Sequence, residues 1–227
     1  MTVDLPIYLL AAVLLLFPRS WMRAGQVFFP RRRKTPRGTN PNEPWRARVP
    51  GDPRLDFRRE FTRFRNYIDL LRAAAGSLLI IGGMGLESCV AVQADASPLA
   101  VKGALALRFG TILVGLLLQT VRLERGHVTF YPPVFYFAGL SIGLCHLTGA
   151  AFAFVMIWAV NPALSSAHAF LTMYALLVVA FGQLFAGRRD LMTIFAGLLC
   201  FLPVLLSLLT RRPLRVLSRK PTRAGAG

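Results

Sequence analysis

Five long apolar segments decide what this chain can fold into. Few charged residues interrupt them, and they cover 73–94, 99–121, 128–160, 163–187 and 190–210. The hydrocarbon core of a bilayer is roughly 30 Å thick, so about 20 apolar residues form one spanning helix. Lipid offers no hydrogen bonds, and a helix is the structure that pairs its backbone groups within a single segment. The sequence therefore predicts an all-α, polytopic helical membrane protein.

The first 25 residues add a shorter apolar segment, from Leu5 to Phe17. Its positive charges, Arg19 and Arg23, follow the apolar residues, whereas in a removable secretory signal they come first. We expect an uncleaved anchor with its N-terminus outside. The alternative is a shallow, half-inserted helix, because a segment this short barely crosses a bilayer. With the anchor, the predicted count is about six transmembrane helices.

Positive charge is concentrated in one part of the chain. Lys and Arg number 27 against 10 Asp and Glu, and 15 of the 27 lie in 19–72. In a soluble protein such an excess would indicate nucleic acid. In membrane proteins, however, Lys and Arg collect on the cytoplasmic side of the helices. We therefore expect 19–72 to be cytoplasmic, and we do not expect nucleic acid as a partner.

Composition divides the chain into five parts. Residues 1–25 are the N-terminal membrane anchor, and 26–51 form a basic, proline-rich cytoplasmic linker. An interfacial amphipathic helix is expected at 52–72, followed by the transmembrane bundle at 73–210 and a basic C-terminal tail at 211–227.

The tail conflicts with the predicted count of spans. Six spans with an outside N-terminus place the tail outside as well, although it carries six basic residues. Either the tail is an exception or one span is miscounted. The segment 128–160 is long for one helix and short for two, and Pro203 offers a way for 190–210 to re-enter without crossing.

The segment 52–72 has a helical pattern of its own. Asp52 and Pro53 have the form of an N-cap and a first helical residue. Apolar residues then recur at spacings of four and three and form one stripe: Phe57, Phe61, Phe64, Ile68 and Leu71. Four arginines fall largely outside this stripe and are expected to contact lipid headgroups: Arg58, Arg59, Arg63 and Arg65. Alternatively, the stripe packs on the protein's own loops.

Three ionisable residues within the predicted spans form a candidate intramembrane polar site: Glu87, Arg108 and His146. An unpaired charge in lipid is costly, so each is a functional candidate. Glu87 and Arg108 lie at similar distances from the turn at 93–98, so they are expected to pair or to snorkel to the surface. His146 is expected to bond to a neighbouring helix, with a proton relay as the alternative.

Other motifs are few. Gly139 and Gly143 form a GxxxG pattern, which allows close helix packing. The sequence holds no phosphate-binding loop, no HExxH pattern and no GxSxG elbow. The spacing of the three cysteines suits neither a zinc site nor a disulfide framework: Cys89, Cys145 and Cys200. We therefore assign no catalytic residue, no metal ligand and no cofactor.

These patterns favour a non-enzymatic membrane scaffold or accessory subunit, located as a multi-pass protein in the bacterial inner membrane. The expected partners are membrane lipids with anionic headgroups and another membrane protein. Two alternatives stay open. One is a small transporter or channel lined by Glu87, Arg108 and His146. The other is a membrane-embedded lipid-modifying enzyme that holds phosphate headgroups with its arginines.

Overall fold

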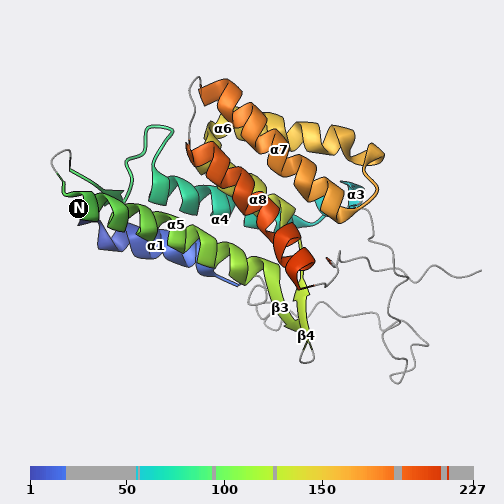
Figure 1. Ribbon diagram of the computed structural model, residues 1–227, viewed down its shortest axis with the longest axis horizontal. Coiled ribbons are helices and arrows are strands. Elements are labelled where there is room, and N and C mark those ends of the chain that lie inside the picture. Colours follow the sequence, from blue (N-terminus) through green and yellow to red (C-terminus); the bar gives the residue numbers. More distant parts are fainter. Residues whose placement is uncertain are drawn as a thin grey trace, which may run out of the picture.

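The computed structural model describes residues 1–18, 55, 57–93, 96–124, 127–186, 191–210 and 214. The linker predicted at 26–51 and the helix start predicted at Asp52 lie outside these residues. So does the tail at 211–227, with the exception of Leu214. The described chain is helical, with two small pairs of strands (Figure 1).

The helices are α1 (Leu5–Leu16), α3 (Phe57–Phe61), α4 (Phe64–Ile81), α5 (Pro98–Thr120), α6 (Val134–Val160), η1 (Asn161–Ala163), α7 (Ala167–Ala186) and α8 (Leu191–Leu209). Strand β1 (Thr2–Val3) pairs antiparallel with β2 (Val90–Ala91). Strand β3 (Val121–Glu124) pairs antiparallel with β4 (His127–Phe130).

By length and composition, four helices are long and apolar enough to cross a membrane: α5, α6, α7 and α8, with α6 taken as one continuous segment. Helix α1 is apolar but shorter. Helix α4 is interrupted by charged side chains, among them Asp69 and Arg72. The protein is therefore membrane-embedded in character, but the predicted count of about six spans is not confirmed.

Capping side chains begin two of the helices. Asp4 accepts a hydrogen bond from the backbone N–H of Ile7 at 3.3 Å, at the start of α1. Ser97 accepts one from the backbone N–H of Ala100, also at 3.3 Å, at the start of α5. Pro98 follows Ser97, and its fixed φ suits a first helical turn.

Helix α4 ends where glycines turn the chain. Gly82 and Gly83 have φ angles of +87° and +123°, which L side chains rarely adopt. The span predicted at 73–94 is therefore wrong beyond Ile81, because the described residues 82–93 lie outside any helix and contain β2. Helix α4 continues without a break from Phe64 across the predicted boundary between the interfacial helix and this span.

Helix α6 is a hairpin of two shorter helices. His146 has φ +60° and ψ 157°, which interrupts the helix. The ring of Phe135 in the first half lies 5.4 Å from that of Phe154 and 6.5 Å from that of Trp158, between centroids. In a straight helix, residues 19 positions apart would be about 28 Å apart. The halves 134–145 and 147–160 therefore lie side by side, and α6 begins and finishes at the same end of the bundle.

Each half of α6 packs on a different neighbour. The first half runs parallel to α4, because Gly139 lies against Ala73 and Gly143 lies against Ser77. The second half runs antiparallel to α7, with Gly149 near Gly182 and Trp158 near Phe170, where the ring centroids are 5.1 Å apart. Helix α8 packs antiparallel to α7, and α1 packs on α4 and α5.

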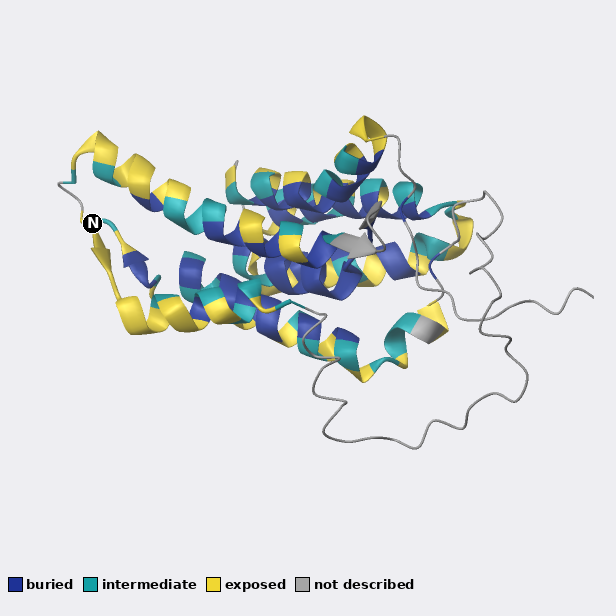
Figure 2. Cartoon of the chain, turned by 90° about the horizontal axis from the view of Figure 1, so that it is seen from below, coloured by how far each residue is buried: buried dark blue, intermediate teal, exposed yellow. Residues whose placement is uncertain are grey.

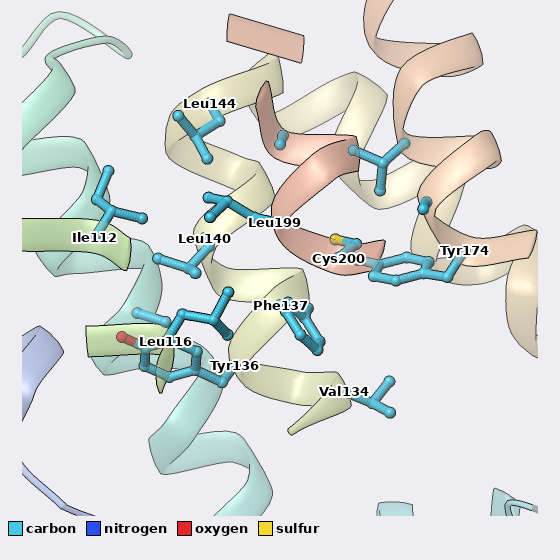
Figure 3. Packing of buried hydrophobic residues seen from close by; sticks show 14 of the residues in the cluster. Ile112, Leu116, Val134, Tyr136, Phe137, Leu140, Leu144, Tyr174, Leu199 and Cys200 are labelled. Carbon is cyan, nitrogen blue, oxygen red and sulfur yellow. The ribbon is translucent and has the colours of Figure 1, made fainter. Parts of the chain in front are cut away.

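The helices meet in one apolar core. Figure 3 shows side chains from α5, α6, α7 and α8 pointing toward one another, including Ile112, Leu140, Tyr174 and Leu199, which are buried. Figure 2 shows buried residues where helices face each other and exposed residues along the outer sides of the helices nearest the N-terminus. Many of the outward side chains are large and apolar, such as Leu99 and Val155. Such a surface suits lipid better than water.

The bundle has two distinct ends. The end that carries β3 and β4, called here the strand end, also holds Phe17, the start of α4 and the end of α5 (Figure 1). At the opposite end, called here the N-terminal end, the backbone N–H of Asp4 donates to the carbonyl of Cys89 at 2.9 Å. The break in α6 at His146 lies toward this second end, since the preceding Cys145 is close to Gly182 near the end of α7.

Candidate functional site

Helix α4 turns its polar residues inward and its apolar residues outward. Asn66, Asp69 and Arg72 are only 2%, 2% and 7% exposed, whereas Phe64 and Leu71 are 77% and 65% exposed. A spacing of three keeps the polar residues on one face. The surface helix of a soluble protein shows the reverse arrangement. The inward polar face of α4 is therefore the strongest candidate for a functional site.

A buried ion pair occupies the middle of this face. The Nη2 atom of Arg72 lies 2.8 Å from Oδ1 of Asp69, and Nε of Arg72 donates to the same oxygen at 3.0 Å. The guanidinium also lies over the ring of Tyr136, with 5.3 Å between the guanidinium carbon and the ring centroid. Breaking such a pair leaves an uncompensated charge in the interior, at a cost of about 3–5 kcal/mol.

The same region supplies hydrogen-bond donors to the carbonyl groups at the C-terminal end of α1. A proline follows Phe17 and supplies no N–H, so the carbonyls of the last turn need other donors. Arg72 and Gln119 both donate to the carbonyl of Phe17, the bond from Gln119 measuring 2.9 Å. The hydroxyl of Tyr136 donates to the carbonyl of Leu15 at 3.0 Å. We call Asp69, Arg72, Gln119 and Tyr136, with these two carbonyls, the α1 junction.

The α1 junction joins four helices at one point. Arg72 belongs to α4, Gln119 to α5 and Tyr136 to α6, and all three bond to the end of α1. A positive charge at a helix C-terminus is also favoured by the helix dipole. The junction therefore fixes where the chain leaves α1 at the strand end.

The predicted intramembrane polar site is not assembled. Glu87 is exposed in the loop after α4, and Arg108 donates to the carbonyl of Val90. His146 is exposed at the break in α6. Within the described part of the chain, no hydrogen bond or ion pair joins Glu87, Arg108 or His146 to one another. Glu87 and Arg108 were expected at similar depth on adjacent helices. This expectation is wrong for Glu87, because α4 ends at Ile81 and Glu87 lies in the loop that follows.

The four arginines predicted to contact headgroups have different surroundings. Arg58 is exposed, and Arg65 is half-buried. Arg63 forms an ion pair of 3.1 Å with Glu60. The side chain of Arg59 lies outside the described part. Contact of these residues with lipid headgroups remains a prediction.

The apolar stripe between these arginines has two kinds of surroundings. Phe61 packs on the protein, with its ring centroid 5.1 Å from that of Phe135 and 5.2 Å from that of Trp158. Phe57 and Phe64 are exposed, at 52% and 77%. The stripe therefore divides between a surface that the protein covers and a surface that faces outward.

The two glycines of the GxxxG pattern lie against α4. A Cβ atom on Gly139 would lie 2.7 Å from the Cβ of Ala73, and one on Gly143 would lie 2.7 Å from the Cβ of Ser77. Both distances are too short for carbon atoms. The absence of a side chain at these positions therefore allows α4 and the first half of α6 to approach closely.

Sequence reasoning missed the α1 junction. A usable signal was present, since Asp69 and Arg72 are opposite charges three residues apart in a helical segment. The small residues that follow, Ala73, Gly76 and Ser77, continue the same face. The arginines of the same segment favoured a different face of the helix as its polar face. No local signal connects Gln119 to a carbonyl about a hundred residues earlier.

Comparisons with models of protein families, with curated proteins and with solved structures found no match. Within the described residues, no three His, Cys, Asp or Glu side chains are placed to hold a metal ion. What the α1 junction does chemically is to keep a charge pair buried while it closes the end of a helix.

Proposed function

We propose that this protein is a membrane scaffold or accessory subunit whose cytoplasmic face is strongly basic. The observation that carries the proposal is the hairpin form of α6. Because α6 begins and finishes at the strand end, the chain enters α7 at the end where α5 finished. Helix α8 then returns the chain to the strand end, where Leu214 is buried and forms a bridge with Phe130.

The basic residues follow this arrangement. Phe17 and Leu55, which flank the segment 19–54, both lie at the strand end, where the carbonyl of Leu55 accepts a hydrogen bond from Asn161 at 3.0 Å. The segments whose described neighbours lie at the strand end carry 15 basic residues in 19–72, two in 122–125 and six in 211–223, which makes 23 of 27. The positive-inside rule then makes the strand end cytoplasmic and the N-terminus external. The tail no longer conflicts with the charge rule.

A face of this kind favours anionic partners. Each basic residue near an anionic membrane surface contributes about 1 kcal/mol, and salt weakens the attraction. The partner is an anionic lipid surface or an acidic segment of another membrane protein. The outward apolar side chains of α4, such as Phe64 and Leu71, are free to contact lipid or a partner helix. The bundle would then keep this basic face in a fixed position, and the α1 junction would stabilise the bundle.

Capture of vesicles tests this function. The protein is placed in nanodiscs of neutral lipid and offered vesicles of phosphatidylglycerol or phosphatidylcholine at increasing salt. We expect capture of the anionic vesicles only, with a steep loss as salt rises. Arg58→Gln with Arg65→Gln should weaken capture several-fold or more, since two charges are removed.

The matched control removes two charges from a different connecting segment. Arg188→Gln with Arg189→Gln, between α7 and α8, should leave capture unchanged. Equal loss in the two double variants would contradict a basic face at the strand end. Turnover of a lipid or another substrate by the purified protein alone would overturn the non-enzymatic proposal.

A further inference from the structure

An open groove of about 640 Å³ lies on the surface between helices α7 and α8. Its walls come from Ala169, Met173 and Leu176 on α7 and from Phe201, Val204 and Leu208 on α8. The volume falls within the range of about 300–1,000 Å³ that is common for sites of small ligands. Almost all of the lining is hydrocarbon, so an occupant must be apolar where it touches these walls.

The depth of the groove matches one leaflet of a bilayer. It extends along α7 from the first turn to Leu176, nine residues after Ala167. At 1.5 Å per residue this is about 14 Å, roughly half of the 30 Å hydrocarbon core. On α8 it extends from Phe201 to Leu208, the penultimate residue of that helix. The groove therefore starts at the strand end and stops near the middle of the membrane.

The polar lining residues, His168 and Thr172, lie in the first two turns of α7, toward the end where the groove starts. His168 lines this end, and its Nε2 atom lies 2.8 Å from Oγ of Ser207. In the sequence, Arg211 and Arg212 come after Thr210, the residue that follows α8. The opposite end, around Leu176 and Phe201, has an apolar lining. A polar end, near which the sequence continues into two arginines, and an apolar end together match the two ends of an anionic lipid.

We propose that the groove binds one acyl chain of an anionic phospholipid from the cytoplasmic leaflet, with the headgroup at the His168 end. The site rests on the membrane orientation proposed above, but not on the scaffold function. The leaflet-deep groove favours a lipid chain over a helix of a second copy, because a partner helix would continue along the full length of α7. The exposed leucines at the rim, Leu176 and Leu208 at 61% and 62%, face the surrounding lipid.

Photo-crosslinking tests this site. Nanodiscs are prepared with a phosphatidylglycerol that carries a diazirine in its acyl chain, and crosslinked peptides are mapped by mass spectrometry. We expect the yield in 167–176 and 201–208 to exceed the yield around Ala180, which is exposed on α7 outside the groove. Ala169→Phe fills the groove and should reduce its crosslinks several-fold.

Ala180→Phe is the matched control, since it adds the same ring on the same helix and should leave the groove crosslinks unchanged. Leu208→Trp repeats the test from α8 at an exposed position, in case Ala169→Phe does not fold. Unchanged groove crosslinks in folded Ala169→Phe or Leu208→Trp would overturn the proposal. An equal yield with the phosphatidylcholine analogue would overturn the anionic headgroup. If the groove gives no crosslinks but the protein still captures anionic vesicles, the proposed lipid site is wrong and the proposed function is not affected.

Discussion

The side chains of Asp69 and Arg72 connect α4 to the end of α1 through a buried ion pair. Each is nearly inaccessible, and Arg72 also donates to the end of α1. An ion pair in such surroundings stabilises little by itself, but the loss of one member is costly. The pair is therefore a sensitive point at which a small chemical change alters the whole α1 junction.

Asp69→Asn should lower the free energy of unfolding by about 3–5 kcal/mol, because the charge of Arg72 stays buried without its partner. Unfolding in detergent, followed by circular dichroism, measures this. Arg63→Gln is the control, since the Arg63 side chain is 32% exposed in its pair with Glu60 and such pairs contribute about 0–1 kcal/mol. The double variant Asp69→Asn with Arg72→Met should recover part of the loss. Equal effects of Asp69→Asn and Arg63→Gln would contradict a buried pair.

His146 adopts a backbone conformation that glycine adopts readily and other residues adopt rarely. Its φ of +60° and ψ of 157° lie in a region that costs other residues about 1–3 kcal/mol. His146→Gly should therefore raise the unfolding temperature. Leu147→Gly, one position later in the second half of α6, should lower it, because glycine weakens a regular helix. Destabilisation by both variants would show that the imidazole contributes more than the strain costs.

Cys89 lies in the loop between α4 and α5, where burial raises the pKa of its thiol. A raised pKa keeps the thiol protonated at neutral pH, and the thiolate is the form that reacts. With Cys145 and Cys200 replaced by Ala, alkylation of Cys89 by iodoacetamide should rise with pH to a midpoint above that of an ordinary thiol, because burial raises the pKa of Cys89. Glutathione in the same buffers is the control. A midpoint at or below that of glutathione would contradict the buried setting.

At the scale of elements, the contact between α4 and α6 depends on missing side chains. Gly139→Ala brings a Cβ to 2.7 Å from that of Ala73, so the helices must separate. Gly110→Ala on α5 meets nothing within 4 Å and gains helix propensity of up to about 1 kcal/mol. Unfolding in detergent should show clear destabilisation for Gly139→Ala and none for Gly110→Ala. If Gly139→Ala is as stable as the unchanged protein, the helices are not in close contact.

The elements differ in how well the sequence predicts them. Apolar runs of sufficient length predicted α5, α7 and α8 to within a few residues, because hydrophobicity and length are local properties. The ends of α4 and the reversal in α6 were not predicted, because they depend on the backbone at Gly82 and His146 rather than on composition. The α1 junction needs Gln119 and Tyr136 to reach residues far away in the chain, and no periodic pattern encodes that contact.

At the scale of the whole molecule, the hairpin in α6 determines where every later segment lies. Two halves of about 18 Å and 21 Å, from their residue numbers and a rise of 1.5 Å, bring the chain back to the strand end. If α6 instead crossed once, α7 and α8 would be inverted and α8 would finish at the end of the bundle opposite to the strand end. The sidedness of the tail is therefore the most direct consequence of the fold.

Labelling with a membrane-impermeant maleimide in intact cells measures this sidedness. The native cysteines are replaced by Ala, and single cysteines are introduced by Thr39→Cys, Gln93→Cys and Ala226→Cys. The proposed arrangement predicts that only Gln93→Cys reacts in intact cells, and that Thr39→Cys and Ala226→Cys react together after permeabilisation. Reaction of Ala226→Cys from the side opposite to Thr39→Cys would contradict the hairpin and, with it, the single basic face.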